Sequence, residues 1–173
     1  QRILATLTEQ IRERIDAFIE NEQVLAEMDA AVAIASWARD YECSLPRFGD
    51  AVRLYGARHP LLHAQLRRAG KENAIVPLDL ELAPDCTTLV ITGSNSGGKT
   101  VALKTLGLAV LLAQAGLPVP ADARSEFRVF EQIFADIGDE QSLTENLSTF
   151  TGHVRRIIGI HRQLDKTAGT PSL

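Results

Sequence analysis

Cysteine is scarce in this sequence, with Cys43 and Cys86 as the two examples among 173 residues. They lie far apart and in no metal-binding or redox spacing, so the sequence disfavours a disulfide framework and a cysteine metal site. Long apolar runs are also missing: no stretch approaches the roughly 20 residues needed to cross a bilayer, and the first residues lack a secretion signal. We therefore expect a cytoplasmic protein without a membrane partner.

An excess of positive charge is absent as well, because the formal net charge is -4. Domains that wrap a nucleic-acid backbone by bulk electrostatics are usually strongly basic, so any nucleic-acid contact is expected to be local or made elsewhere. The length and the 45% hydrophobic content allow one sizeable core and a small satellite region. The missing initiator methionine favours a fragment.

The N-terminal part reads as a helical arm. Apolar residues recur in steps of three and four over residues 2–20, which predicts an amphipathic helix. Residues 24–39 are rich in alanine and predict a second helix, packed closely on a neighbour. Pro46 and Gly49 then break the periodicity. We place a boundary near residue 45, which gives a helical arm over 1–45 and a second domain over 46–173.

The second domain reads as a mixture of short strands and helices. Strands are expected over 51–55, 74–82, 87–92, 127–130 and 132–137. An apolar helix is predicted over 98–115, buried on several sides, and a final amphipathic helix over 143–164. This alternation predicts the α/β class.

The most informative segment is glycine-rich and lies between the expected strand at 87–92 and the expected helix at 98–115. Glycines let successive backbone N–H groups surround an anion, and the following helix adds its positive dipole end. Lys99 is placed to reach the β- and γ-phosphates, and the Thr100 hydroxyl to bind Mg²⁺. The segment is a complete phosphate-binding loop, or P-loop: Gly93-Ser94-Asn95-Ser96-Gly97-Gly98-Lys99-Thr100.

A nucleotide hydrolase of this class also needs a strand that ends in a Mg²⁺-binding aspartate, with an acid nearby to position the attacking water. Within this chain Asp136 is the candidate ligand and Glu140 the candidate base. The alternative is that both are turn residues or acids at a helix start. Judged from its residue type alone, Ser148 is an ordinary helix N-cap. Histidines in the positions of His59 and His153 are more often packing residues than catalytic ones.

Two segments, 92–105 and 134–153, closely resemble the ATPase domain of the MutS family. Within that family they are more similar to the bacterial branch that suppresses recombination. Further segments of the resemblance are Arg58-His59-Pro60 and Ile75-Val76-Pro77. The arm resembles, more weakly, the end of the family's lever. The resemblance implies an ABC-type P-loop ATPase core, of which this chain carries the N-terminal half. It implies that ATP or ADP and Mg²⁺ bind through the loop residues, Val101, Ile75, Val76 and His59.

The resemblance also implies that the metal-binding aspartate and the catalytic glutamate lie beyond Leu173, and that Ser148 contacts the γ-phosphate held by a second subunit. Implied partners are a second copy of the protein, branched or mismatched DNA bound by other regions, and the ribosome. The family's nuclease lies in a domain outside these residues. Two positions depart from the family: Ser94 replaces proline, which loosens the loop, and Leu78 replaces asparagine, which leaves adenine recognition less certain.

Two hypotheses of different classes follow. In the first, the chain is part of a dimeric DNA-processing ATPase in which ATP binding drives a clamp. This hypothesis implies a nucleoid-associated location, and it implies that this chain alone hydrolyses little ATP. The second is a self-contained small kinase or regulatory nucleotide-binding module that uses Asp136 as its Mg²⁺ ligand. The Ser148-Thr149-Phe150 motif favours the first, because a monomeric kinase has no reason to carry it.

Overall fold

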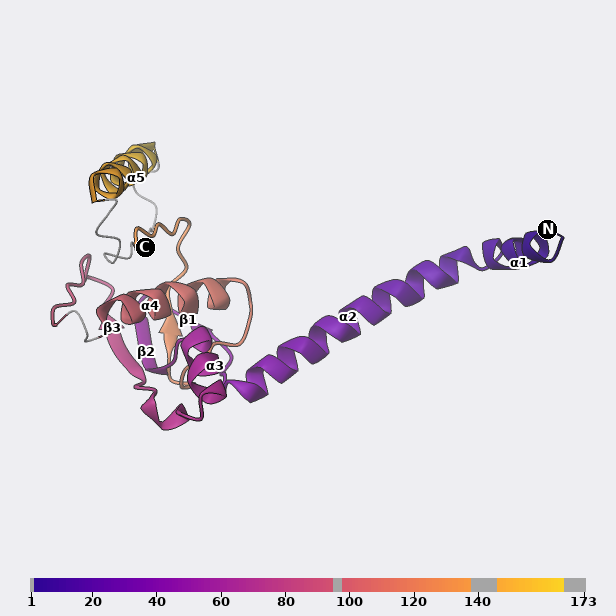
Figure 1. Ribbon diagram of the computed structural model, residues 1–173, viewed down its shortest axis with the longest axis horizontal. Coiled ribbons are helices and arrows are strands. Elements are labelled where there is room, and N and C mark those ends of the chain that lie inside the picture. Colours follow the sequence, from indigo (N-terminus) through magenta and orange to yellow (C-terminus); the bar gives the residue numbers. More distant parts are fainter. Residues whose placement is uncertain (1, 95–97, 138–145, 167–173) are drawn as a thin grey trace.

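The protein is described here from a computed structural model that covers residues 2–94, 98–137 and 146–166. It combines a small mixed sheet, a helix packed on one side of it, further helices and a long helical arm (Figure 1). The chain therefore has the mixed α/β character that the alternation of elements predicted.

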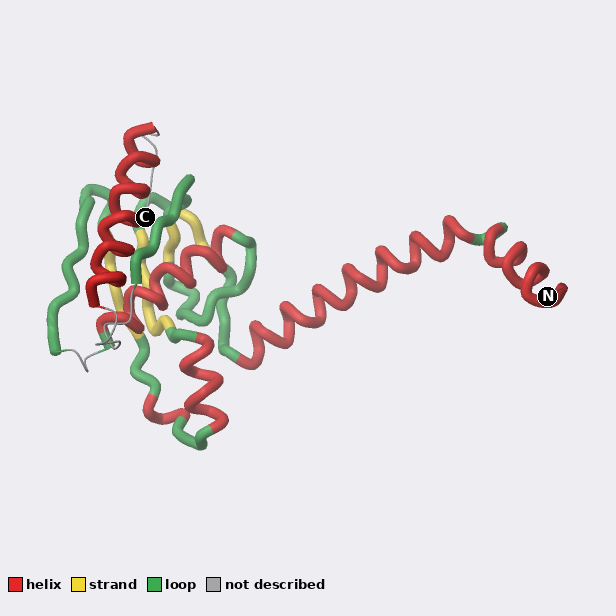
Figure 2. The backbone as a smooth tube through the Cα atoms, turned by 45° about the horizontal axis from the view of Figure 1, so that its top comes forward, coloured by secondary structure: helices red, strands yellow, loops and turns green. Residues whose placement is uncertain are grey.

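The arm consists of α1 (Arg2–Arg12) and α2 (Ile15–Asp40), and it projects away from the rest of the molecule (Figures 1 and 2). The predicted break near residues 21–23 is wrong: α2 runs through it, because no glycine or proline interrupts its hydrogen bonds there. The helices separate instead at Glu13 and Arg14, where the sequence offers no breaker. The expected close packing of the second helix is wrong too, since Leu25 and Val32 are 64% and 62% exposed.

The sheet has the strand order β1-β4-β2-β3. Its strands are β1 (Arg47–Phe48), β2 (Val52–Ala57), β3 (Leu78–Leu82) and β4 (Glu126–Phe127). β2 pairs antiparallel with both β3 and β4, whereas β1 and β4 are parallel. Side chains alternate along β2, so that Val52 and Leu54 are buried and Arg53 is half-buried. β2 is the longest strand of the sheet and lies between β3 and β4.

Helix α4 (Lys99–Gln114) supplies the other half of the core. Its residues Leu106, Ala109, Val110 and Ala113 form one buried cluster with β2 and Phe127. This helix was expected to be buried on several sides, and that expectation is wrong. Leu103 and Leu111, on other faces of α4, are 45% and 51% exposed, because the described part of the chain covers α4 on one side.

Several strand predictions fail in the same region. Residues 87–92 form no strand and are almost all exposed, because a strand that is apolar throughout is stable only when neighbours cover it and pair with it. The expected strand over 127–130 shrinks to β4, and residues 133–137 are irregular. The strand over 74–82 starts only at Leu78, because the short 3₁₀ helix η1 (Glu72–Ala74) and Pro77 precede it.

Two further helices complete the fold. α3 (Pro60–Arg68) was not predicted, although Pro60 at the first helical position after a capping residue is a helix-start signal. α5 (Asn146–Lys166) matches the predicted final helix, whose first residues, 143–145, lie outside the described ranges. None of the helices in the described ranges combines the length and apolarity that a membrane crossing needs.

Candidate functional site

The glycine-rich loop joins the irregular segment after β3 to the N-terminus of α4. Gly98 is the residue that precedes the helix, and its φ of 78° lies in the left-handed region that favours glycine. Gly93, at the start of the loop, has a φ of 150°. Asn95, Ser96 and Gly97 lie outside the described residues. Gly93 and Gly98 therefore flank the loop with conformations that side chains with a Cβ disfavour.

Lys99 begins α4 and its ammonium group turns back to the loop. It donates hydrogen bonds to the carbonyl oxygens of Gly93, at 2.5 Å, and Ser94, at 2.9 Å. Thr100 follows in the first turn and is exposed. The first N–H groups of a helix have no partner within the helix and attract anions, so Lys99 and the helix end together place positive character beside Thr100.

A cavity of about 410 Å³ opens beside this point. It brings together five of the residues that sequence reasoning assigned to a nucleotide, although they come from three separate segments. His59 comes from the start of α3, Ile75 and Val76 from the segment after η1, and Gly98 and Val101 from the start of α4. Apart from Thr105 the other lining residues are apolar, which is the usual character of a small-molecule site. Leu78, which departs from the family pattern, also lines the cavity.

His59 is held in place by a helix-capping interaction. Its Nδ1 accepts a hydrogen bond from the Leu62 N–H at 3.5 Å, which makes His59 the N-cap of α3. Burial lowers the pKa of His59 below its ordinary value of 6.5, and the positive charge of Lys104 lowers it further. Both effects favour the neutral imidazole.

Five lining residues had no place in the sequence prediction: Ala57, Leu62, Ala74, Ala102 and Thr105. Thr105 could have been found, because it lies four residues after the predicted Val101 and so shares one face of α4 with it. Leu62 could not have been predicted as a lining residue, because α3 itself was not predicted.

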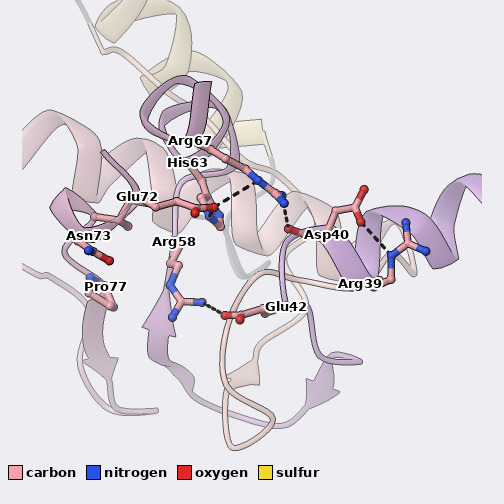
Figure 3. A pocket seen from close by; sticks show the side chains of 10 residues that line it. Arg39, Asp40, Glu42, Arg58, His63, Arg67, Glu72, Asn73 and Pro77 are labelled. Atoms are coloured by element: carbon pink, nitrogen blue, oxygen red, sulfur yellow. Dashed lines mark hydrogen bonds and ion pairs between the residues drawn. The ribbon is translucent and has the colours of Figure 1, made fainter. Parts of the chain in front are cut away.

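A second, larger cavity of about 620 Å³ lies at the base of the arm (Figure 3). Its walls are charged, in contrast to the first. Arg58 pairs with Glu42 at 2.7 Å, and Arg67 pairs with Glu72 at 3.3 Å. The Arg67 side chain also reaches the Asp40 carbonyl oxygen at 3.4 Å. These contacts connect the end of α2 to α3 and η1.

The two cavities share a wall, because Ile75 and Pro77 line both. Arg58 and His59 are likewise adjacent in the chain, but Arg58 faces the charged cavity and His59 the apolar one. The base of the arm and the candidate nucleotide cavity are therefore neighbours across these residues.

The remaining predicted residues lie elsewhere. Asp136 forms an ion pair with Arg156 of α5 at 3.3 Å. Glu140 lies outside the described residues, as do the side chains of Ser148 and His153 within α5. Over the described ranges no group of three or more His, Cys, Asp or Glu side chains is arranged to hold a metal ion. Cys43 and Cys86 are both free thiols, and burial raises the pKa of Cys43 to about 11.

Comparison with known proteins identifies the class to which this chain belongs. Residues 89–168 match the family model of MutS domain V, a piece of the MutS ATPase domain. That range includes the glycine-rich loop, α4 and α5. The chain therefore belongs to the MutS family.

Within that family the chain is MutS2-like. It is 46% identical over 167 residues to the endonuclease MutS2 of Geobacillus sp. (strain WCH70), which covers 95% of this chain and 20% of that protein. It is 45% identical over 170 residues to the putative endonuclease MutS2 of Bacillus subtilis (strain 168), covering 97% of this chain and 21% of the relative. The chain thus spans about a fifth of the length of these relatives.

Proposed function

We propose that the chain binds ATP or ADP in the apolar cavity, with the phosphates on the loop from Gly93 to Thr100. The observation that carries this proposal is the opening of the cavity beside Gly98 and the N-terminus of α4. Base and ribose would occupy the apolar part, between His59, Ile75 and Val76. Lys99 would exchange the carbonyl oxygens of Gly93 and Ser94 for phosphate oxygens, which are better acceptors for an ammonium group.

Mg²⁺ would be held by the Thr100 hydroxyl together with phosphate oxygens and water. A hydroxyl oxygen is a suitable ligand for this ion, and Thr100 is exposed in the first turn of α4. The ion would neutralise charge on the β- and γ-phosphates. An aspartate and a glutamate outside this chain would complete the hydrolytic site.

The wider proposal is that the chain belongs to a MutS-type DNA-processing ATPase, in which ATP binding drives a dimeric clamp. Its support is membership of the MutS family and the names of the relatives, which are endonucleases. We propose that residues 46–173 are the N-terminal part of the ATPase domain and residues 1–45 the arm that connects it to the rest. The same proposal includes suppression of recombination, binding of branched or mismatched DNA, and association with the ribosome and nucleoid. It also includes contact of Ser148 with the partner's nucleotide.

The self-contained kinase has less support. It requires Asp136 to bind Mg²⁺ at the phosphate loop, whereas the Asp136 carboxylate is paired with Arg156 of α5. An arginine competes with a metal ion for the same oxygens, so this pairing disfavours Asp136 as the ligand.

The test is the affinity of the chain for ADP and Mg²⁺, measured by isothermal titration calorimetry. Lys99→Ala removes a charge-assisted contact to phosphate, and we expect it to weaken binding about 10- to 100-fold. Lys71→Ala is the matched control, because Lys71 is exposed, lies in the loop after α3 and lines neither cavity. Equal affinity of the wild type and Lys99→Ala would contradict the proposed site.

A further inference from the structure

The short connection between β2 and α3 takes part in both cavities. β2 ends at Ala57 and His59 caps α3, so Arg58 is the single residue between the strand and the helix cap. Ala57 and His59 line the candidate nucleotide cavity, whereas Arg58 lines the charged cavity at the base of the arm. Neighbouring side chains of an extended segment point in opposite directions, which accounts for this alternation. The position of Arg58 therefore affects the wall formed by its two neighbours.

Arg58 is held by its backbone and by its side chain. Its N–H donates a hydrogen bond to the Pro120 carbonyl oxygen at 2.9 Å. Its guanidinium group pairs with the Glu42 carboxylate at 2.7 Å (Figure 3). Glu42 lies two residues after the end of α2, so this ion pair joins the connection between β2 and α3 to the base of the arm.

Glu42 has an unusual backbone conformation. Its φ of 51° lies in the left-handed region, and among the described residues other than glycine it is the one with a positive φ. A residue with a Cβ adopts this conformation at a cost in free energy, and such residues persist where surrounding contacts fix them, often at functional sites. The Glu42 side chain is 72% exposed, yet its carboxylate is directed to Arg58 and not into water. The contact with Arg58 is thus made by a strained residue.

We propose that Glu42 and Arg58 are positioning residues of the nucleotide cavity. Their ion pair fixes the segment that carries Ala57 and His59, and neither of the two charged side chains contacts the nucleotide. A wall that is fixed before binding loses less conformational freedom when the ligand binds, so the affinity is higher. The inference rests on the proposed nucleotide function and adds to that site a residue from the base of the arm.

The first experiment removes the positive charge of the pair. Arg58→Gln should weaken ADP binding about 2- to 5-fold, the modest size expected for a partly exposed ion pair. Binding of inorganic tripolyphosphate should stay unchanged, because the phosphates are assigned to the loop and not to this wall. Arg124→Gln is the matched control: Arg124 also pairs with an acid, Asp122 at 2.9 Å, but lines neither cavity. Both affinities are measured by isothermal titration calorimetry with Mg²⁺ present.

The second experiment separates positioning from stability. Glu42→Gly removes the carboxylate, while glycine adopts the left-handed conformation without strain. We expect ADP binding to weaken by the same factor as in Arg58→Gln. The urea midpoint of unfolding should change little, because relief of the backbone strain offsets the loss of an exposed ion pair. A general loosening of the fold would not produce this combination.

The third experiment restores the pair with its charges exchanged. Glu42→Arg alone places two arginines together and should weaken ADP binding. Combining Glu42→Arg with Arg58→Glu should return the affinity to within about 2-fold of the wild type, since the two changes compensate only if the residues interact.

The outcomes are distinct. If Arg58→Gln and Glu42→Gly bind ADP as tightly as the wild type, or lose tripolyphosphate as strongly as ADP, the pair does not position this wall and the inference is overturned, although the nucleotide site stands. A reversed pair that binds no better than Glu42→Arg alone leads to the same conclusion. If the wild type binds neither ADP nor tripolyphosphate, the proposed nucleotide site fails, and the inference fails with it.

Discussion

At the scale of single residues, Gln114 shows how one side chain can take the place of a strand partner. Its amide nitrogen donates to the Phe130 carbonyl oxygen and its amide oxygen accepts from the Phe130 N–H, both at 2.9 Å. Phe130 is 5% exposed, and the chain around it is irregular. The last residue of α4 therefore satisfies both backbone groups of a buried residue that no strand pairs with.

We expect Gln114→Ala to lower the free energy of unfolding by about 2 kcal/mol, because it leaves a buried N–H and a buried C=O without their partners. Urea unfolding followed by far-ultraviolet circular dichroism measures this loss. Gln65→Ala is the control, since Gln65 is an exposed residue of α3 and should change the stability by less than about 0.5 kcal/mol. A loss of the same small size for Gln114→Ala would show that the two hydrogen bonds are not formed in solution.

At the scale of elements, the arm carries apolar residues that its own fold leaves uncovered. Five of them are spaced seven residues apart, the repeat of a helix that packs along another helix, and all are more than half exposed: Leu4, Ile11, Phe18, Leu25 and Val32. Exposed apolar residues contribute little to folding, because folding does not remove them from water.

A matched pair of leucines tests this reading of the arm. Leu54→Ala, in β2 at 0% exposure, should lower the free energy of unfolding by about 2–5 kcal/mol, because it leaves a cavity in the core. Leu25→Ala, in α2 at 64% exposure, should change it by less than about 0.5 kcal/mol. The comparison is made by thermal unfolding at one protein concentration. A Leu25→Ala effect near that of Leu54→Ala would mean that the arm is covered in solution.

The elements that sequence reasoning predicted well are those whose signals are local. α4 and most of α5 follow from periodicity, and β2 from its apolar pattern. The prediction of a strand over 87–92 failed for the opposite reason. Its apolar residues predict a strand, but a strand forms only against neighbours, and the sequence does not say where those neighbours are. The interruption at Glu13 and Arg14 has no local signal at all.

The candidate site was predictable to the extent that motifs mark it. Gly98 belongs to the loop motif, while His59, Ile75, Val76 and Val101 came from the family resemblance; the structure places all five at one cavity. Their role in binding stays a prediction. The charged cavity at the base of the arm could not be foreseen, because its residues come from four segments whose charges each read as ordinary surface.

At the scale of the whole molecule, the proposed site is incomplete for hydrolysis. In the proposed function the acid that positions the attacking water lies outside this chain, so we expect the chain to bind nucleotide but to release phosphate from ATP at a rate near that of the uncatalysed reaction. A phosphate-release assay measures this rate, with the Lys99→Ala variant as the background control. Turnover that is clearly above background and lost in Asp136→Asn would instead support the self-contained kinase or hydrolase.

The contact between α2 and the rest of the protein can be followed by tryptophan fluorescence. Trp37, the only tryptophan, donates its indole N–H to the Pro118 carbonyl oxygen at 2.9 Å and lies 4.4 Å, between ring centroids, from Tyr41. The emission of a single indole depends on whether water or protein surrounds it. Selective excitation of Trp37 therefore gives a label-free signal from the base of the arm, and a red shift would report its detachment.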